Sequence, residues 1–314
     1  MKSKIQKSAI LLFFSSFLIM SCSDTEDKTV VVVGNTISST LKNLFSQNTS
    51  DLIQTFQMSA ADNSIVFTST RGVTLTIYRS CLRKNNLSVT GTVDFEFIEI
   101  FDRGTMLVTN KPTLGMVGTE KHLLTSGGEF YINATQGGDQ LTLTCSMFLN
   151  VPTSITGGTD INMTGFSGEE DANGNIIWSN STSNEFWASN LSPGAAETYN
   201  TFVSKFGWFN CDKFISFPNG STKITAYVPQ EYGNGKSLIF LAVKNFPNSL
   251  GQTSGTFPIG LECSLIFVSE NNGSIKYAIK QNIVLAANHQ VTFESSEMAT
   301  ATTAEMVTII NALQ

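Results

Sequence analysis

Few residue types in this chain could carry catalysis, and they lie far apart. The sequence has two histidines, His122 and His289, and neither belongs to an HExxH, GxSxG or Cys–His pattern. An imidazole that activates a nucleophile needs its partners within hydrogen-bond reach, and no signature places them there. We interpret each histidine as a surface or turn residue. The sequence therefore predicts a protein that is not an enzyme, with no catalytic residue and no cofactor.

A short acidic loop is a candidate for cation binding. Glu169, Glu170 and Asp171 precede Ala-Asn-Gly-Asn at 172–175, and carboxylate and amide oxygens are the ligands that Ca²⁺ prefers. The loop lacks the later glutamate that completes an EF-hand. A solvated hairpin turn explains the same residues, and we predict the turn, with no metal site.

Aromatic residues between positions 178 and 209 suggest a binding site. The three tryptophans are Trp178, Trp187 and Trp208, and Phe186 precedes the second of them. Flat aromatic faces bind sugar rings, and the asparagines nearby could supply polar contacts. This hypothesis names Trp178, Phe186 and Trp187 and expects both tryptophans in one exposed groove. Packing in a β-sandwich core or a domain interface is the alternative, and we favour it for Trp208 and, by a smaller margin, for Trp187.

Four cysteines follow Cys22 in the sequence, namely Cys81, Cys145, Cys211 and Cys263. They are widely spaced and form no CxxC pair, which argues against a zinc site. Disulfides form readily in an exported protein. The apolar surroundings of Cys145 and Cys263 fit buried thiols equally well, so both interpretations stay open.

The first residues of the chain have the order of a secretory signal. Three lysines lie among the first seven residues, and an uncharged apolar run fills 9–20. This run is shorter than the about 20 apolar residues that span a membrane. Ile-Met-Ser-Cys at 19–22 resembles the lipobox of bacterial lipoproteins, although Met20 stands where that motif usually has a small residue. The resemblance implies cleavage before Cys22 and lipidation of Cys22.

Acidic residues directly follow this cysteine. Asp24, Glu26 and Asp27 resemble the acidic export signal of surface lipoproteins in the Bacteroidota, with Thr25 interrupting the run. A plain hydrophilic tether is the alternative. We expect an outer-membrane protein that is held by lipid on Cys22 and displayed at the cell surface, although a periplasmic orientation stays open.

Composition narrows the classes of partner. The chain has 19 Lys and Arg against 25 Asp and Glu, a net charge of −6, and no basic cluster. This balance argues against nucleic acid and against electrostatic binding to anionic lipid. Charged residues make up only 14% of the chain, which is typical of a secreted β-protein.

Short β-branched and aromatic runs, separated by turns about 8 to 12 residues apart, predict strands. Apolar and acidic residues alternate over 93–97. At Ile98 and Ile100 the apolar side chains change face, which predicts a bulge near Phe97 or a strand that changes sheets. Asn-Gly within 270–273 predicts a hairpin turn.

Three segments have helical patterns. The pattern predicts a short helix within 40–55, with Leu41 and Phe45 on one side, and a second helix over 195–206. Thr302 and Glu305 fit a capping box that opens a C-terminal helix.

These elements predict an all-β chain of two β-sandwich-like domains behind a lipoprotein signal peptide, with a short C-terminal helix. The expected parts are a signal peptide (1–21), a lipidated tether (22–34), a first β-sandwich-like domain (35–155), an irregular connecting region (156–206) and a second domain that includes the helix (207–314).

Longer segments resemble Bacteroidota envelope lipoproteins with tandem β-sandwich-like domains. The resemblance rests on GTVDFEFIEI from 91, TSGGEFYINA from 125 and GWFNCDKF from 207. It implies an envelope β-protein and brings no catalytic residues. We therefore expect a lipid-anchored protein with a non-catalytic binding or scaffolding role, whose partners are the membrane through Cys22 and a glycan or envelope protein. A surface glycan-binding module is the alternative, and a hydrolase is less favoured.

Overall fold

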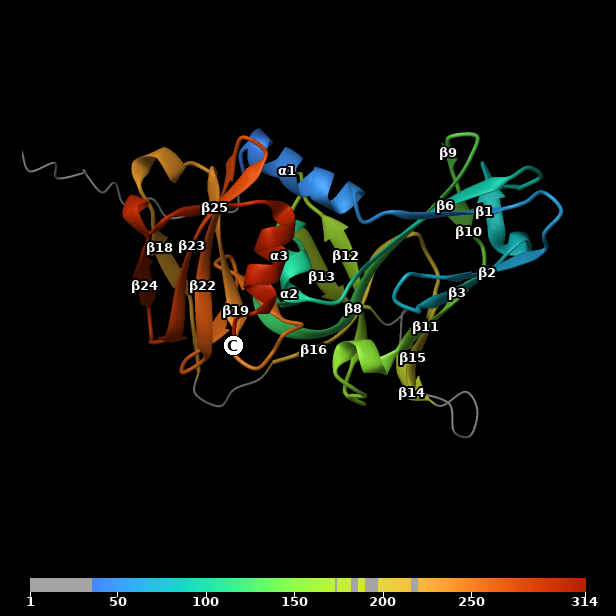
Figure 1. The fold of residues 1–314 in the computed structure, drawn as a ribbon. Helices are drawn as coiled ribbons and strands as arrows, with labels where there is room; N and C mark the ends of the chain where they lie inside the picture. Colours follow the sequence, from blue (N-terminus) through green and yellow to red (C-terminus); the bar gives the residue numbers. More distant parts are fainter. Residues whose placement is uncertain (1–35, 173, 182–185, 190–196, 216–219) are drawn as a thin grey trace, which may run out of the picture.

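The computed structural model describes residues 36–172, 174–181, 186–189, 197–215 and 220–314. Strands make up 51% of the chain and helices 15%, so the protein is mostly β, as predicted. Several sheets, one small barrel and short helices form an elongated molecule (Figure 1). Cys22, the signal segment and the tether lie outside the described residues.

The longest strand, β8 (Glu120–Gln136), is shared by two parts of the fold. It pairs first with β7 (Leu114–Val117), then with β16 (Gly207–Phe214) and finally with β6 (Val93–Ile100). Beyond β6 the sheet continues into β1 (Gln54–Met58), and β9 (Asp139–Gln140) turns back along the end of β8.

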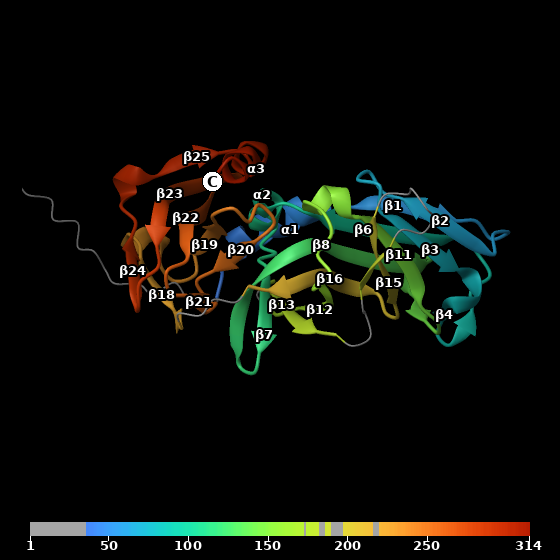
Figure 2. The ribbon, with the colours of Figure 1, turned by 90° about the horizontal axis from the view of Figure 1, so that it is seen from below.

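Five strands close into a small barrel beside the middle of the molecule (Figure 2). β16 pairs with β12 (Thr164–Glu170), β12 with β13 (Ile176–Asn180), and β13 with β7, which also pairs with β8. Phe166 and Trp178 from these strands lie in one buried core. Gly115 permits this closure, because a Cβ there would lie 2.9 Å from Cε1 of Phe214.

A second sheet covers β6 and the second half of β8. Its order is β14 (Trp187–Ser189), β15 (Thr198–Val203), β11 (Met147–Pro152), β3 (Thr74–Tyr78) and β2 (Ser64–Thr68). The core between the two sheets is rich in phenylalanine. The ring of Phe130 lies 6.2 Å from that of Phe97 and 5.5 Å from that of Phe209, measured between centroids.

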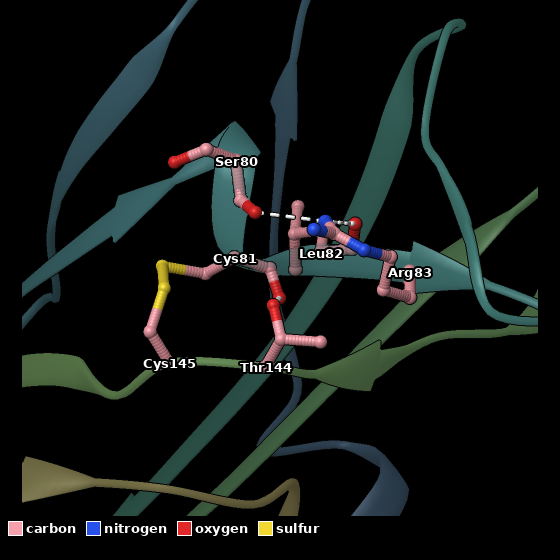
Figure 3. The surroundings of a disulfide bond; sticks show 6 residues. All are labelled: Ser80, Cys81, Leu82, Arg83, Thr144 and Cys145. Atoms are coloured by element: carbon pink, nitrogen blue, oxygen red, sulfur yellow. Dashed lines mark hydrogen bonds between the residues drawn. A yellow bond between two sulfur atoms is a disulfide. The ribbon is translucent and has the colours of Figure 1, made fainter.

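A disulfide between Cys81 and Cys145 closes the outer end of this half (Figure 3). It joins the turn η1 (Arg79–Cys81) to the chain between β10 (Thr142–Leu143) and β11. The Thr144 amide also donates to the Cys81 carbonyl at 2.8 Å. β10 pairs with β4 (Leu82–Lys84), which pairs with β5 (Leu87–Ser88). Cys211 and Cys263 are buried free thiols. The buried-thiol interpretation thus holds for Cys263 and is wrong for Cys145, which is exposed and forms the disulfide.

The other half of the molecule is built on a sheet in the order β20 (Leu250–Gln252), β19 (Ser237–Val243), β22 (Glu262–Asn271), β23 (Ser274–Val284) and β25 (Ala299–Ala301). One face packs with α1 (Ser39–Ser50), α2 (Arg103–Val108) and α3 (Thr303–Asn311) (Figure 1). A parallel pair, β18 (Ile224–Tyr227) and β24 (His289–Thr292), shares the core on the opposite face. Short elements complete this half: β17 (Ser221–Thr222), β21 (Phe257–Pro258), η3 (Gln230–Tyr232) and η4 (Ser295–Glu297); η2 (Thr153–Thr156) follows β11.

Predictions that depend on local sequence are confirmed. The turn between β22 and β23 places Asn272 at φ 50° and Gly273 at φ 82°. In the capping box of α3, the Thr302 side chain accepts from the Glu305 amide, and the Glu305 side chain accepts from the Thr302 amide. The predicted first helix is α1, with Leu41 and Phe45 buried.

The helix predicted over 195–206 is wrong, because β15 occupies Thr198–Val203. β15 pairs with β11 on one side and β14 on the other, so its β-branched and aromatic residues fill a sheet. The region 156–206, which we expected to be irregular, also holds β12, β13 and β14. Strand pairing crosses the predicted boundary at 207, since β16 pairs with β8. The division into two domains stays a prediction.

The change of face in β6 comes neither from the predicted bulge nor from the predicted change of sheets, because β6 stays between β1 and β8 in one sheet. The pairing of β6 with β8 runs without a break from Asp94 to Ile100. Val93, Phe95 and Phe97 contact the phenylalanine-rich core, whereas Ile98 and Ile100 on the other face contact the core with the helices. The first part of β6 thus buries one face in the phenylalanine-rich core, and its end buries the opposite face in the core with the helices. The register with β8 is unchanged.

Arg103, at the start of α2, joins three elements. Its side chain is 2% exposed, and burial lowers its pKa. The guanidinium donates to the carbonyls of Ile310 at 3.0 Å and Val243 at 3.1 Å, and also to that of Leu313. It therefore adds charged hydrogen bonds to carbonyls at the end of α3 and the end of β19, and it joins these elements to α2.

We expect Arg103→Ala to lower the free energy of unfolding by at least about 3 kcal/mol, because it removes three charged hydrogen bonds and the packing of a buried side chain. Denaturant titration followed by circular dichroism measures this loss. Arg83→Ala is the matched control: Arg83 bonds only the neighbouring carbonyls of Ser80 and Leu82, and its loss should cost less than about 1 kcal/mol. Equal costs for the two variants would contradict the role of Arg103.

Candidate functional site

Three aromatic rings lie together on the outward face of the second sheet. Trp187 comes from β14, Phe202 from β15 and Phe148 from β11. Their ring centroids are 5.6 Å apart for Trp187 and Phe202, 5.4 Å for Phe148 and Phe202, and 6.3 Å for Phe148 and Trp187. Trp187 is 41% exposed and Phe202 54%. We call these three residues the aromatic face.

Strand alternation produces this arrangement. In β15, Tyr199 and Val203 are buried in the core, and Phe202 points outward. Phe148 stands directly opposite Phe202 in the register of β11 and β15, and opposite side chains in an antiparallel pair are close enough to touch. β14 adds Trp187 at the edge of the same sheet.

A row of amide groups borders the aromatic face. Asn200 stands opposite Asn150 on one side and Trp187 on the other. The Nδ2 of Asn150 donates to Oδ1 of Asn200 at 2.7 Å, and the Nδ2 of Asn200 donates to Oγ of Ser189 at 2.9 Å. These bonds fix the side chains of Asn150, Asn200 and Ser189 in a row that runs across the strands beside the three rings.

The structure separates the three residues of the sequence-based ligand site. Trp178 is fully buried, and its Nε1 donates to the Pro112 carbonyl at 3.0 Å. Phe186 is buried in the phenylalanine-rich core, and Trp187 alone of the three is exposed. The single groove with Trp178 and Trp187 is therefore absent from the described residues, because β13 turns Trp178 into the barrel. There Trp178 packs edge-on against Trp208 at 6.5 Å, which confirms the packing predicted for Trp208.

Sequence reasoning missed Phe148 and Phe202. The predicted helix over 195–206 concealed the alternation of β15, which would have placed Phe202 opposite to Tyr199 and Val203. The pairing of β11 with β15 is long-range, so the sequence offers no local signal that brings Phe148 to Trp187.

The acidic loop forms the predicted hairpin turn between β12 and β13. The amide of Asp171 donates to the Asn175 carbonyl at 2.9 Å, and Oδ1 of Asp171 accepts from the Asn175 amide at 3.0 Å. The turn lies against α1, where Nζ of Lys42 donates to the Ala172 carbonyl at 2.7 Å. Its carboxylate is thus already engaged in holding the turn.

The histidines belong to different strands. His122 lies in β8, with Nε2 3.8 Å from a carboxylate oxygen of Glu120. His289 begins β24; its Nδ1 accepts from the Ala286 amide at 3.3 Å, and burial lowers its pKa. Both side chains are partly exposed, and no described acid and nucleophile complete a triad with either.

A polar cluster is enclosed where β8 meets β16. The strand register shifts between Asn210 and Asp212, and on β8 the extra residue falls at Gly127 and Gly128, where Gly128 has φ +125°. Glu129, Asn210 and Asp212 are all 0% exposed. Burial, together with the charge of Asp212, raises the pKa of Glu129 well above its usual value, and burial does the same for Asp212.

Neither a known protein family nor a curated protein matches this chain. No helix among the described residues is both long and apolar enough to cross a membrane.

We expect Trp187 to account for the tryptophan fluorescence that acrylamide quenches. Trp178 is 0% and Trp208 8% exposed, so Trp187→Phe should shift the emission of the full chain to the blue and lower its Stern–Volmer constant severalfold. Trp208→Phe, as the control, should leave most of the quenching. Unchanged quenching in Trp187→Phe would contradict the exposed position of Trp187.

Proposed function

We propose that this chain is a non-catalytic binding protein of the outer membrane, anchored by lipid on Cys22 and displayed at the cell surface. We further propose that its strands form two β-sandwich-like domains, and that the aromatic face binds carbohydrate. The observation that carries the binding proposal is the exposure of three adjacent aromatic rings on an open sheet.

The chemistry of the aromatic face suits a sugar chain. Trp187, Phe202 and Phe148 offer apolar surface to the C–H faces of pyranose rings. A ligand that covers exposed aromatic side chains removes them from water, so stacking contributes free energy to binding. Asn150 and Asn200 are buried and bonded to each other, so they hold the strands that carry the rings. The three rings are uncharged, and a neutral glycan needs no charged partner.

The disulfide supports an extracytoplasmic location. Cys81 and Cys145 are bonded, and such bonds persist in oxidising compartments. This agrees with the signal segment and with the lipobox resemblance at Cys22.

A non-catalytic role is supported by the placement of the acids. Glycoside hydrolysis uses two carboxyl groups that reach the substrate from either side. Glu129 and Asp212 are enclosed, and a sugar on the aromatic face lies on the far side of a sheet from them.

Binding of an envelope protein is the second candidate. β2 lies at the edge of the same sheet, and Val66 on it is 64% exposed. An edge strand offers unpaired backbone groups to a partner strand, so this alternative places the contact on β2 and leaves Trp187 uninvolved.

We expect Trp187→Ala and Phe202→Ala each to weaken carbohydrate binding by about 2 kcal/mol, or roughly thirtyfold in Kd. The probe is a panel of soluble neutral polysaccharides, measured by affinity electrophoresis and calorimetry with the full chain in detergent. Val284→Ala, which removes exposed apolar surface in the other half of the molecule, should bind normally. Binding that survives both aromatic substitutions would contradict the proposal, and a complete lack of binding would favour a protein partner.

Replacing Cys22 by Ala should prevent incorporation of labelled palmitate and release the protein from the membrane fraction, because stable anchoring needs more than one acyl chain. Cys263→Ala, which removes a buried thiol, should keep both properties. Membrane retention of the Cys22→Ala variant would contradict the anchor.

A further inference from the structure

The enclosed polar cluster between β8 and β16 contains more oxygen acceptors than donors. Both carboxylate oxygens of Glu129, Oδ1 of Asn210 and Oδ1 of Asp212 have no hydrogen-bond partner. Nδ2 of Asn210 donates to Oδ2 of Asp212 at 2.8 Å. Oγ of Ser126 accepts from the Gly128 amide at 2.9 Å, and the Ser126 hydroxyl interacts with the Asp212 carboxyl group.

The register of the two strands brings these oxygens to one place. Glu129 stands directly opposite Asn210, and Asp212 stands opposite Ser126 at the other side of the bulge. Opposite residues of an antiparallel pair have Cβ atoms about 4.5–5.5 Å apart. The glycines of the bulge let β8 and β16 approach closely here, since a Cβ on Gly127 would lie 3.0 Å from the Cys211 carbonyl oxygen.

The nearest buried cation is engaged elsewhere. Nζ of Lys111 lies 2.8 Å from a carboxylate oxygen of Glu170 and 5.1 Å from the ring centre of Trp208. It lowers the pKa of Glu129 only in part, against the larger effects of burial and Asp212. Lys111 and the Ser126 side chain therefore offset the burial of the two carboxyl groups only in part.

Two chemical states would compensate the four unpartnered oxygens. Protonation of both carboxyl groups would supply two O–H donors, and Oδ1 of Asn210 could accept one of them. A divalent cation would instead contact the oxygens directly and would balance two ionised carboxylates. The two states differ in metal content, so a measurement of bound metal distinguishes them.

We propose that Glu129, Asn210 and Asp212 form a binding site for one calcium ion at the bulge between β8 and β16. Two carboxylates balance the charge of a divalent ion, and all of the free ligand atoms are oxygens, which hard cations prefer. Calcium accepts irregular oxygen geometry and a bidentate carboxylate, whereas magnesium demands an octahedron and retains several waters. Glu129, Asn210 and Asp212 are fully buried, so a cation that keeps several of its waters fits this cluster less well than calcium.

Asn210 distinguishes this site from an ordinary pair of acids. Within the described ranges, no three His, Cys, Asp or Glu side chains gather to hold a metal, so the third ligand is an amide. Asn210 and Asp212 alternate along β16 with Phe209 and Cys211, which face the phenylalanine-rich core. The calcium ion would therefore lie on the opposite face of β16, the face of Trp208. We infer that it is bound as the chain folds and is retained afterwards.

The test is to unfold the full chain in denaturant with EDTA and to refold it in detergent with or without CaCl₂. Refolding with calcium should give about one calcium ion per chain by atomic emission and a higher thermal midpoint than refolding in EDTA. Terbium bound in place of calcium should show luminescence sensitised by Trp208, which is two residues from Asn210. Calcium should displace it.

Two variants and a control complete the experiment. Glu129→Gln and Asp212→Asn keep the side-chain shape and should each lower calcium affinity roughly tenfold or more, as even outer-shell changes do. Glu262→Gln alters an exposed acid that pairs with Lys244 and should bind calcium normally. If the wild-type chain refolds equally well in EDTA and holds no calcium, or if both cluster variants still bind one calcium ion, the proposal is overturned.

Discussion

The backbone hydrogen bonds of β8 are the interaction on which the rest of the structure depends. β8 pairs with β7 and β16 inside the barrel and with β6 in the phenylalanine-rich half. Its side chains contribute to three cores, through Leu123, Leu124 and Phe130. The loop before β20 binds it as well, because Asn248 accepts from the Ser126 amide and donates to its carbonyl. A break in β8 would therefore separate the two halves.

Local signals made part of this fold predictable. The Asn-Gly turn before β23, the capping box at Thr302 and the alternation in β6 each depend on neighbouring residues, and each was found. The barrel was not predicted, because its closure needs β7 to pair with both β8 and β13, and no local pattern encodes such contacts. β15 was mistaken for a helix because its pairing with β11, and not its own propensity, decides its conformation.

The aromatic face also depends on contacts between distant residues that no local pattern predicts. Trp187 could be named because it stands within a stretch rich in Ser and Asn, where a tryptophan is unusual. Trp178 has similar neighbours, yet the turn at Asp171 directs it into the barrel. Phe148 and Phe202 became part of the face only through strand register. Single residues with unusual surroundings can thus be predicted, whereas the surface that they share depends on long-range pairing.

The two unpaired cysteines lie in different cores. Cys211 belongs to the phenylalanine-rich core and Cys263 to the core beneath β22. Burial raises the pKa of Cys211 well above its ordinary value and that of Cys263 to about 12. Neither thiol therefore reacts as a thiolate while the core around it stays folded. Each thiol becomes reactive only when its own core opens. The chain thus carries two internal reporters, whose rates of alkylation compare the opening of one half with that of the other.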